Sequence, residues 1–120
     1  MLSIAFCDDE PIMLEELFNV VKGYIDSKKV EFTADLFESG EEFVEKGVRC
    51  RKYDIVFLDI EMKEMNGLEA AAWFRKLNEQ SKVIFVSSHV EYTLDAFKVA
   101  AFRYIIKNKD TMTQGVQEES

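Results

Sequence analysis

The chain has 120 residues, which is enough for one domain with one core and too few for two. Its formal net charge of −8, from 23 acidic and 15 basic residues, repels phosphate backbones and argues against nucleic-acid binding by this stretch. No apolar run approaches the roughly 20 residues of a membrane span, and the amino end lacks the basic flank of a signal peptide. The two cysteines suit a reducing compartment, so the composition favours a cytoplasmic protein without membrane contact.

Short apolar runs alternate with amphipathic stretches along the chain. This order predicts an α/β fold in which helices cover a doubly wound parallel sheet. The apolar runs predict five strands, over residues 2–7, 30–36, 53–60, 82–86 and 103–107. Between them, helical spacing and capping residues predict four helices, which begin near Pro11, Ser39, Asn66 and Glu91.

Local signals bound the predicted helices and orient them. Capping boxes are predicted at the second and third helix starts, Ser39 with Glu42 and Asn66 with Glu69. The last helix, over 91–101, carries Leu94 and Phe97, and we expect both side chains to face the core.

The alternation of strands and helices does not continue into residues 108–120, NKDTMTQGVQEES, because only Met112 and Val116 are apolar there. A helix there would cover its side of the sheet thinly. We therefore predict one folded domain over 1–107 and a polar tail over 108–120. The tail is either a weak fifth helix or the start of a linker to a missing output domain. We favour the second interpretation, in which the chain is a fragment of a longer protein.

An acidic residue stands where the third apolar run ends. Asp59 directly follows Ile55–Leu58, and an unpaired buried carboxylate is costly, so Asp59 either meets a partner or faces a site. In a doubly wound sheet, the working site lies beyond the carboxyl ends of the strands. Three other predicted strands also end in polar residues, namely Asp8 and Asp9, Ser87 and Ser88, and Lys107. The pattern therefore predicts three carboxylates, two hydroxyls and one ammonium at one edge of the sheet.

Three carboxylates close together need a compensating positive charge. Mg²⁺ suits a shallow carboxylate site that keeps several waters, and Lys107 would add a charge from the other side. A carboxylate between a cation and an ammonium stays ionised and can act as a nucleophile toward phosphorus. Phosphoryl transfer also needs positive charge and donors on the equatorial oxygens, which Mg²⁺, Lys107, Ser87 and a backbone N–H near Ser88 would supply.

Each of these residues also has a purely structural interpretation. Asp8 and Asp9 precede a helix, where acidic side chains cap the backbone and favour the dipole. Ser88 forms a capping-box pattern with Glu91, which favours a cap over a ligand. Lys107 alone would be a solvated lysine at a strand end. Several independent strand ends with the right residue types nevertheless favour a real site.

The motifs at these strand ends resemble the receiver domain of two-component response regulators, over residues 2–107. The motifs are FCDDEP after the first strand, VFLDIEM and MNGLEAA around the third, VIFVSSH at the fourth and FRYIIK at the fifth. The stretches NGLEAA and SSHVEYTLDAFKVAAFRYIIK are most similar to the LytTR subgroup (the LytR and AgrA type), in which a receiver precedes a DNA-binding domain. The resemblance implies a flavodoxin-like sheet with strand order 2-1-3-4-5 and a role in transcription control.

The resemblance also implies a phosphorylation site. Asp59 would be the phosphoacceptor and would take a phosphoryl group from a phosphohistidine of a sensor histidine kinase. Mg²⁺ would be held by Asp8, Asp9 and Asp59 together with the backbone carbonyl of Glu61. We expect a signalling phosphoacceptor with weak autophosphotransfer and autodephosphorylation rather than an enzyme.

A switch is implied as well. Ser87 would bind the phosphoryl group beside Lys107 and act with Tyr104, the switch aromatic, to alter the face formed by the fourth helix and the fifth strand. The thinly covered sheet edge suggests a homodimer through that face. His89, the only histidine, is expected at the surface near the start of the fourth helix.

Two departures and two rival functions accompany this resemblance. Asn108 follows Lys107 where receivers commonly have proline, and Lys63 stands where proline is common in the loop after the phosphoacceptor. One rival is a Mg²⁺-dependent phosphatase that forms an aspartyl phosphate. Glu61 is the second acid such an enzyme needs, but the rest of that pattern is missing. The other rival is a pseudo-receiver, a binding module that is not phosphorylated. The complete set of acidic, hydroxyl and lysine residues argues against it.

Overall fold

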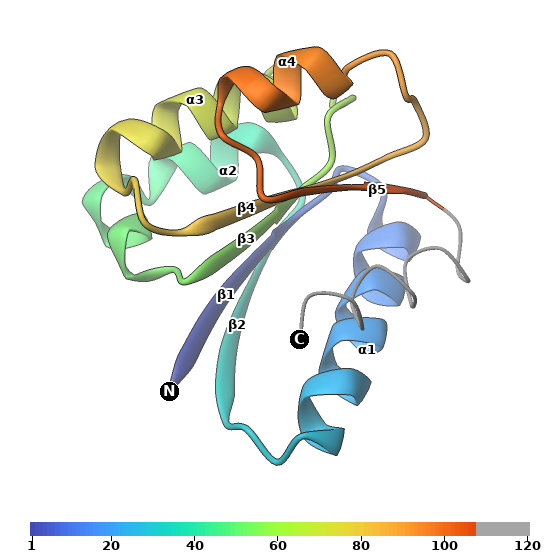
Figure 1. The fold of residues 1–120 in the computed structure, drawn as a ribbon, viewed down its shortest axis with the longest axis vertical. Coiled ribbons are helices and arrows are strands. Elements are labelled where there is room, and N and C mark those ends of the chain that lie inside the picture. The colour runs from blue at the N-terminus through green and yellow to red at the C-terminus, as the bar shows by residue number, and fades with distance from the viewer. Residues whose placement is uncertain (108–120) are drawn as a thin grey trace.

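Five strands form one parallel sheet in the order β2-β1-β3-β4-β5, which confirms the predicted topology (Figure 1). The computed structural model describes residues 1–107, so the predicted tail and Asn108 lie outside the described residues. The strands are β1 (Leu2–Cys7), β2 (Phe32–Phe37), β3 (Ile55–Leu58), β4 (Lys82–Ser87) and β5 (Arg103–Ile106). The helices are α1 (Pro11–Ser27), α2 (Gly40–Glu45), α3 (Gly67–Leu77) and α4 (Thr93–Lys98), and a 3-10 helix, η1 (Gly47–Lys52), precedes β3.

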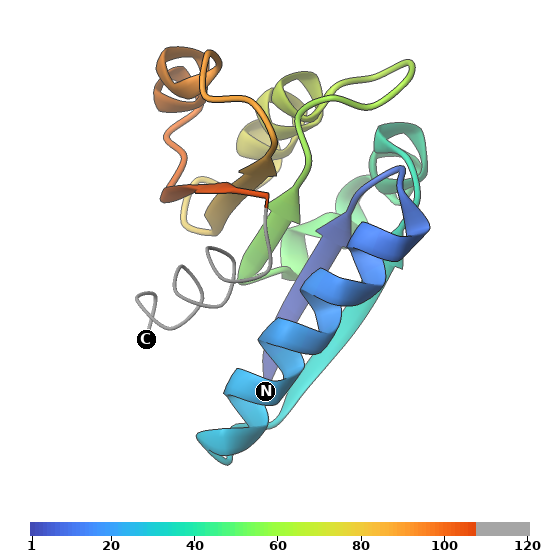
Figure 2. The same cartoon turned by 90° about the vertical axis from the view of Figure 1, so that its right-hand side faces the viewer.

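Helices cover both faces of the sheet. Helices α2, α3 and α4 lie on one face and α1 lies on the other (Figure 1 and Figure 2). Side chains alternate along β1, so Ala5 and Cys7 join the core on the α2 and α3 side while Ile4 and Phe6 join the core under α1. The central strands are apolar on both sides because both sides are covered.

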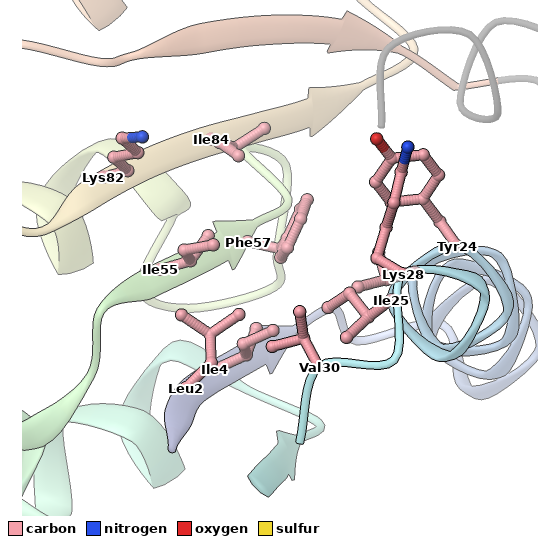
Figure 3. Close-up of a pocket in the computed structure, with 11 residues that line it drawn as sticks. Leu2, Ile4, Tyr24, Ile25, Lys28, Val30, Ile55, Phe57, Lys82 and Ile84 are labelled. Carbon is pink, nitrogen blue, oxygen red and sulfur yellow. The ribbon is translucent and has the colours of Figure 1, made fainter. Parts of the chain in front are cut away.

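The α1 face has an apolar cavity of about 200 Å³ at the amino ends of the strands (Figure 3). Its walls include the first residues of three strands, Leu2, Ile55 and Lys82, and the α1 side chains Tyr24 and Ile25. Within residues 1–107, α1 is the only helix on this face (Figure 2). Because Leu2, Ile55 and Lys82 are the first residues of their strands, the cavity lies at the edge of the sheet opposite to the carboxyl ends.

Capping residues set the starts of two helices, as predicted. The Ser39 hydroxyl accepts a hydrogen bond from the Glu42 N–H at 3.0 Å at the start of α2. Asn66 and Glu69 form a reciprocal capping box at the start of α3. The chain leaves α2 through Gly47, whose φ of +58° is a conformation that glycine adopts readily.

Two strands begin later than predicted. β2 begins at Phe32 rather than at residue 30, and β3 begins at Ile55 rather than at residue 53. Tyr53 is the C-cap residue of η1, where its N–H donates to the Cys50 carbonyl at 3.1 Å, and its hydroxyl donates to Asp35 Oδ2 of β2 at 2.5 Å. No helix within residues 1–107 combines the length and the apolar character needed to cross a membrane.

Helix α4 is shorter than predicted and starts later. It spans Thr93–Lys98, and its N-cap residue is Tyr92. The expected capping box of Ser88 and Glu91 is therefore not the start of this helix, and that prediction is wrong. The residues before Thr93 instead form an irregular connection from the end of β4.

The orientation of α4 also differs from the prediction. Leu94 and Phe97 are 79% and 83% exposed, so the expectation that they face the core is wrong. The buried residue of α4 is Ala96. Its small side chain lets the short helix rest closely on the core, and this orientation turns the two large side chains to solvent.

Candidate functional site

Strand pairing brings two acidic residues together. In the register of β1 and β3, Cys7 lies beside Leu58, so Asp8 and Asp59 follow at the carboxyl ends of neighbouring strands. The Asp59 N–H donates to the Cys7 carbonyl at 2.9 Å, which extends the ladder to this point. Asp8 and Asp59 are only 2% and 3% exposed. The sheet thus places two buried carboxylates side by side, as the strand-end pattern predicts.

The pairing of β4 and β5 brings Lys107 to the same edge. The Lys107 N–H donates to the Ser87 carbonyl at 2.8 Å just after β5 ends. The Nζ atom of Lys107 lies 3.1 Å from Asp8 Oδ2, 3.1 Å from Asp59 Oδ2 and 3.2 Å from Glu10 Oε1. One ammonium therefore contacts three carboxylates, and two of these are buried.

Burial sets the protonation of this group. Burial raises the pKa of Asp59 to about 7, and the neighbouring Asp8 carboxylate adds to the rise. The pKa of Asp8 is also raised by burial. Burial alone would lower the pKa of Lys107, but the Asp59 and Asp8 carboxylates outweigh it and raise that pKa. Lys107 therefore stays charged, but its charge does not offset the rise that burial causes in the pKa of the two carboxyl groups. The sequence predicts that Asp59 stays ionised between Mg²⁺ and Lys107, and a bound cation would lower the pKa of Asp59.

The oxygen atoms at this edge suit such a cation. Carboxylate oxygens of Asp8, Asp9, Glu10 and Asp59 all lie within 4.8 Å of one another. Asp9 is half-buried, and its Oδ2 accepts from the Lys63 N–H at 3.2 Å, in the loop that follows Asp59. Hard oxygen donors with an excess of negative charge fit Mg²⁺. The residues present therefore fit the expected metal.

Ser87 and Tyr104 are connected through the backbone of His89. Ser87 is fully buried at the end of β4, and its Oγ accepts from the His89 N–H at 3.1 Å. The Tyr104 hydroxyl donates to the His89 carbonyl oxygen. Burial raises the pKa of Tyr104, and the nearby Ser87 hydroxyl opposes that rise. Ser88 is exposed and takes no part in this group.

Glu61 lies in the loop after Asp59 and turns its side chain toward the segment before α4. Its Oε2 lies 3.0 Å from His89 Nε2. The other ring nitrogen of His89 lies 2.9 Å from Glu91 Oε1. His89, expected as a surface residue near a helix start, is only partly exposed and joins two carboxylates from different loops.

Two residues at this edge were missed by sequence reasoning. Glu10 contacts Lys107, and its place in the DDE run after β1 was the available signal. Gly67 begins α3 directly against Asp59, where an added Cβ would lie 2.0 Å from the Asp59 carbonyl oxygen. Its N–H donates to the Ile60 carbonyl at 2.8 Å. The Asn66-Gly67 pair marked a helix start, but no pattern indicated what the glycine faces.

Comparison with known proteins identifies the family. The family model for the response regulator receiver domain matches residues 4–116. The transcriptional regulatory protein LytR of Staphylococcus aureus (strain N315) is 31% identical over 103 residues, which cover 83% of this chain and 39% of that protein. The sensory transduction protein LytT of Bacillus anthracis is 35% identical over 112 residues, which cover 92% of this chain and 43% of that protein. The chain thus spans about two fifths of the length of these curated relatives.

Solved structures share the fold. The receiver domain of AraT, a response regulator from Geobacillus stearothermophilus, matches with a TM-score of 0.80 at 23% identity, over 98% of this chain and 91% of that chain. The response regulator TrrA from Thermotoga maritima matches with a TM-score of 0.71 at 32% identity, over 98% of each chain. Together with the family model, these matches show that the chain belongs to the response regulator receiver domain family.

Proposed function

We propose that this domain is a Mg²⁺-dependent phosphoacceptor switch that takes a phosphoryl group from a sensor histidine kinase onto Asp59. One observation carries the proposal: the Lys107 ammonium lies 3.1 Å from an oxygen of Asp8 and from an oxygen of Asp59. A buried ion pair adds little net stability compared with apolar residues in the same place. A buried cluster with a strongly shifted pKa is a typical property of a functional site.

The proposed transfer is a displacement at phosphorus. An oxygen of Asp59 forms the new P–O bond while the P–N bond to the kinase histidine breaks, and the histidine nitrogen keeps that electron pair. Lys107 stays protonated and neutralises charge on a phosphoryl oxygen. Mg²⁺, held by Asp8, Asp9, Asp59 and the Glu61 backbone carbonyl, would supply the positive charge that the cluster lacks.

The proposed switch runs through Ser87 and Tyr104. A phosphoryl group on Asp59 competes for the Ser87 hydroxyl, which accepts from the His89 N–H in this structure. Because the Tyr104 hydroxyl donates to the carbonyl of the same residue, a shift of His89 reaches Tyr104 and the segment before α4. The readout surface would be the face of α4 and β5.

We also propose that this face forms a homodimer. Val90, Leu94 and Phe97 expose apolar side chains on or next to α4, with exposures of 62%, 79% and 83%. Clustered exposed apolar residues are typical of an interaction surface. A dimer would bury these side chains, which do not pack in the core of the domain.

The whole protein would control transcription from the cytoplasm. A relative that carries the same domain is named a transcriptional regulatory protein. We propose that a DNA-binding output domain follows the receiver, because a net charge of −8 makes the receiver itself unsuited to DNA. Residues 1–107 would then form the receiver, and 108–120 would begin the connection.

Incubation with Mg²⁺ and acetyl phosphate, followed by an intact-mass measurement, tests the proposed site. We expect one added phosphoryl group on the wild type and none on Asp59→Asn. Asp95→Asn, which alters an exposed carboxylate of α4, is the matched control and should keep the label. Label on Asp59→Asn would place the acceptor elsewhere. Sustained turnover of a phosphate monoester would favour the phosphatase, and an unlabelled wild type would favour the pseudo-receiver.

A further inference from the structure

Helix α4 has little apolar anchorage of its own. Of its residues Thr93–Lys98, Ala96 is the one that is buried, while Leu94 and Phe97 point to solvent. A helix this short is also unstable by itself in water. Its position on the sheet must therefore depend on contacts at its two ends.

A single carboxylate ties the start of α4 to the loop that follows Asp59. Glu61 uses both of its oxygens: Oε1 accepts from the Tyr92 hydroxyl at 3.0 Å, and Oε2 lies 3.0 Å from His89 Nε2. Tyr92 is the N-cap residue of α4. The two contacts therefore grip the helix start and the residues directly before it.

A different residue holds the end of α4. Arg75, from α3, donates from Nε to the Val99 carbonyl at 2.9 Å and from Nη2 to the Ala100 carbonyl at 2.8 Å. Its Nη1 donates to the Ser81 carbonyl at 2.5 Å, in the connection before β4. These acceptors are backbone atoms of turns remote from the acidic cluster. Burial lowers the pKa of Arg75, but a guanidinium titrates far above neutral pH, so these hydrogen bonds keep a charged donor at neutral pH.

We infer that the Glu61 carboxylate is a positioning group that clasps the start of α4 to the loop after Asp59, while Arg75 is the fixed anchor at the other end. Glu61 stands two residues from Asp59 in the chain, so a shift of this loop moves the acceptor of the Tyr92 and His89 contacts. The start of α4 then moves about the Arg75 end. This route acts through side chains, and it meets the backbone link between Ser87 and Tyr104 at His89.

The link to signalling rests on the proposed function, but the clasp is a property of the unphosphorylated chain. Amide hydrogen exchange followed by mass spectrometry, without phosphodonor, tests it directly. In Glu61→Ala, amides over 90–96 should exchange about fivefold faster than in the wild type, because partly exposed polar contacts are individually modest. Amides of α1 and of residues 99–101 should not change.

Matched variants separate the clasp from general loosening. Glu64→Ala removes an exposed carboxylate from the same loop and should leave residues 90–96 unchanged. Tyr92→Phe should speed the same amides as Glu61→Ala, and the double variant should add little further. Glu61→Gln keeps an acceptor for the Tyr92 hydroxyl and should recover part of the protection.

Arg75→Met should have the converse effect, because it removes the anchor at the other end of α4. Amide exchange over residues 99–101 should then be faster than in the wild type. Wild-type exchange over 90–96 in both Glu61→Ala and Tyr92→Phe would overturn the clasp, as would an equal effect of Glu64→Ala. None of these outcomes depends on whether Asp59 accepts a phosphoryl group. Failure of the clasp is therefore distinguishable from failure of the proposed function.

Discussion

The Nζ atom of Lys107 lies 3.1 Å from Oδ2 of Asp59, and the two side chains are 6% and 3% exposed. The same ammonium contacts the equally buried Asp8. One buried cation is thus shared by two buried anions, so the charge balance at this edge of the sheet affects stability as well as chemistry.

Replacement of Lys107 by methionine should destabilise the domain by about 3 kcal/mol at pH 8 without Mg²⁺, because it leaves two buried carboxylates without their cation. The loss should shrink toward pH 5, where a carboxyl group binds a proton instead. Urea unfolding at both pH values measures the change. Lys76→Met, at an exposed position of α3, should stay within about 0.5 kcal/mol of the wild type. A Lys107→Met protein of wild-type stability at pH 8 would contradict the assigned ion pairs.

Asp59→Asn should change how stability depends on pH. The pKa of Asp59 rises from 3.8 to about 7 on folding. Between these values the folded chain keeps a proton that the unfolded chain has released, so the contribution of Asp59 to stability is present below the lower value and is lost as pH rises to the upper one. The variant should therefore exceed the wild type by about 2 kcal/mol at pH 8 and match it near pH 4.

The measurement is chemical unfolding at a series of pH values in EDTA. Glu79→Gln, at an exposed position after α3, is the control and should follow the wild-type curve. A constant difference between Asp59→Asn and the wild type over this range would argue against a raised pKa.

Mg²⁺ should stabilise the wild type and reduce the penalty of the buried carboxylates. A cation that binds only the folded state adds about 1.4 kcal/mol at ten times its dissociation constant. Thermal unfolding during a Mg²⁺ titration should show this gain, and EDTA should reverse it. Asp8→Asn and Asp9→Asn should lose most of it. An equal gain in NaCl at matched ionic strength would indicate general screening rather than a bound ion.

Gly67→Ala should disturb Asp59 through the backbone. The added methyl group would lie 2.0 Å from the Asp59 carbonyl oxygen, so either α3 or the end of β3 must shift. We expect a loss of roughly 3 kcal/mol in stability, typical of severe overpacking, and slower labelling by acetyl phosphate.

Gly23→Ala is the natural control for this change. A Cβ at Gly23, inside α1, meets nothing within 4 Å, and the change should stabilise the helix by about 0.5 to 1 kcal/mol. Similar effects of the two substitutions would exclude the close approach at Gly67 as the cause.

Phe97→Ser should weaken the proposed dimer without loss of folding, because Phe97 is 83% exposed. Light scattering at high concentration, with and without acetyl phosphate and Mg²⁺, measures the association. Val48→Ser removes an apolar side chain of η1 that is 68% exposed and should leave association unchanged. A wild-type chain that stays monomeric in both states would rule out a dimer of this domain alone.

Much of the site could be predicted because it is encoded at strand ends. Asp59 directly follows a run of strand residues, and parallel strands align their carboxyl ends, so Asp8 and Lys107 were expected beside it. The orientation of α4 could not be predicted in the same way. Helical spacing groups Leu94 and Phe97 on one side, but it does not tell whether that side faces the core or serves as an interaction surface.

Contacts between loops also remained beyond prediction. The pairing of Glu61 with Tyr92 and the grip of Arg75 on the end of α4 join segments whose paths follow no period. The raised pKa of Asp59 could not be predicted for a related reason. Its pKa depends on how deeply the fold buries the cluster, and burial is a property of the packed sheet rather than of the residues in order.

The aromatic pair beneath the acidic residues has a consequence for folding. Phe6 and Phe57 are register partners in β1 and β3, and their rings stack with centroids 5.1 Å apart. Misalignment of these strands by one step would part the rings and send the Asp59 side chain to the opposite side of the sheet. A collapsed chain with misaligned strands would thus not accept a phosphoryl group. During refolding, the time at which the chain first accepts a phosphoryl group would therefore report the alignment of β1 and β3.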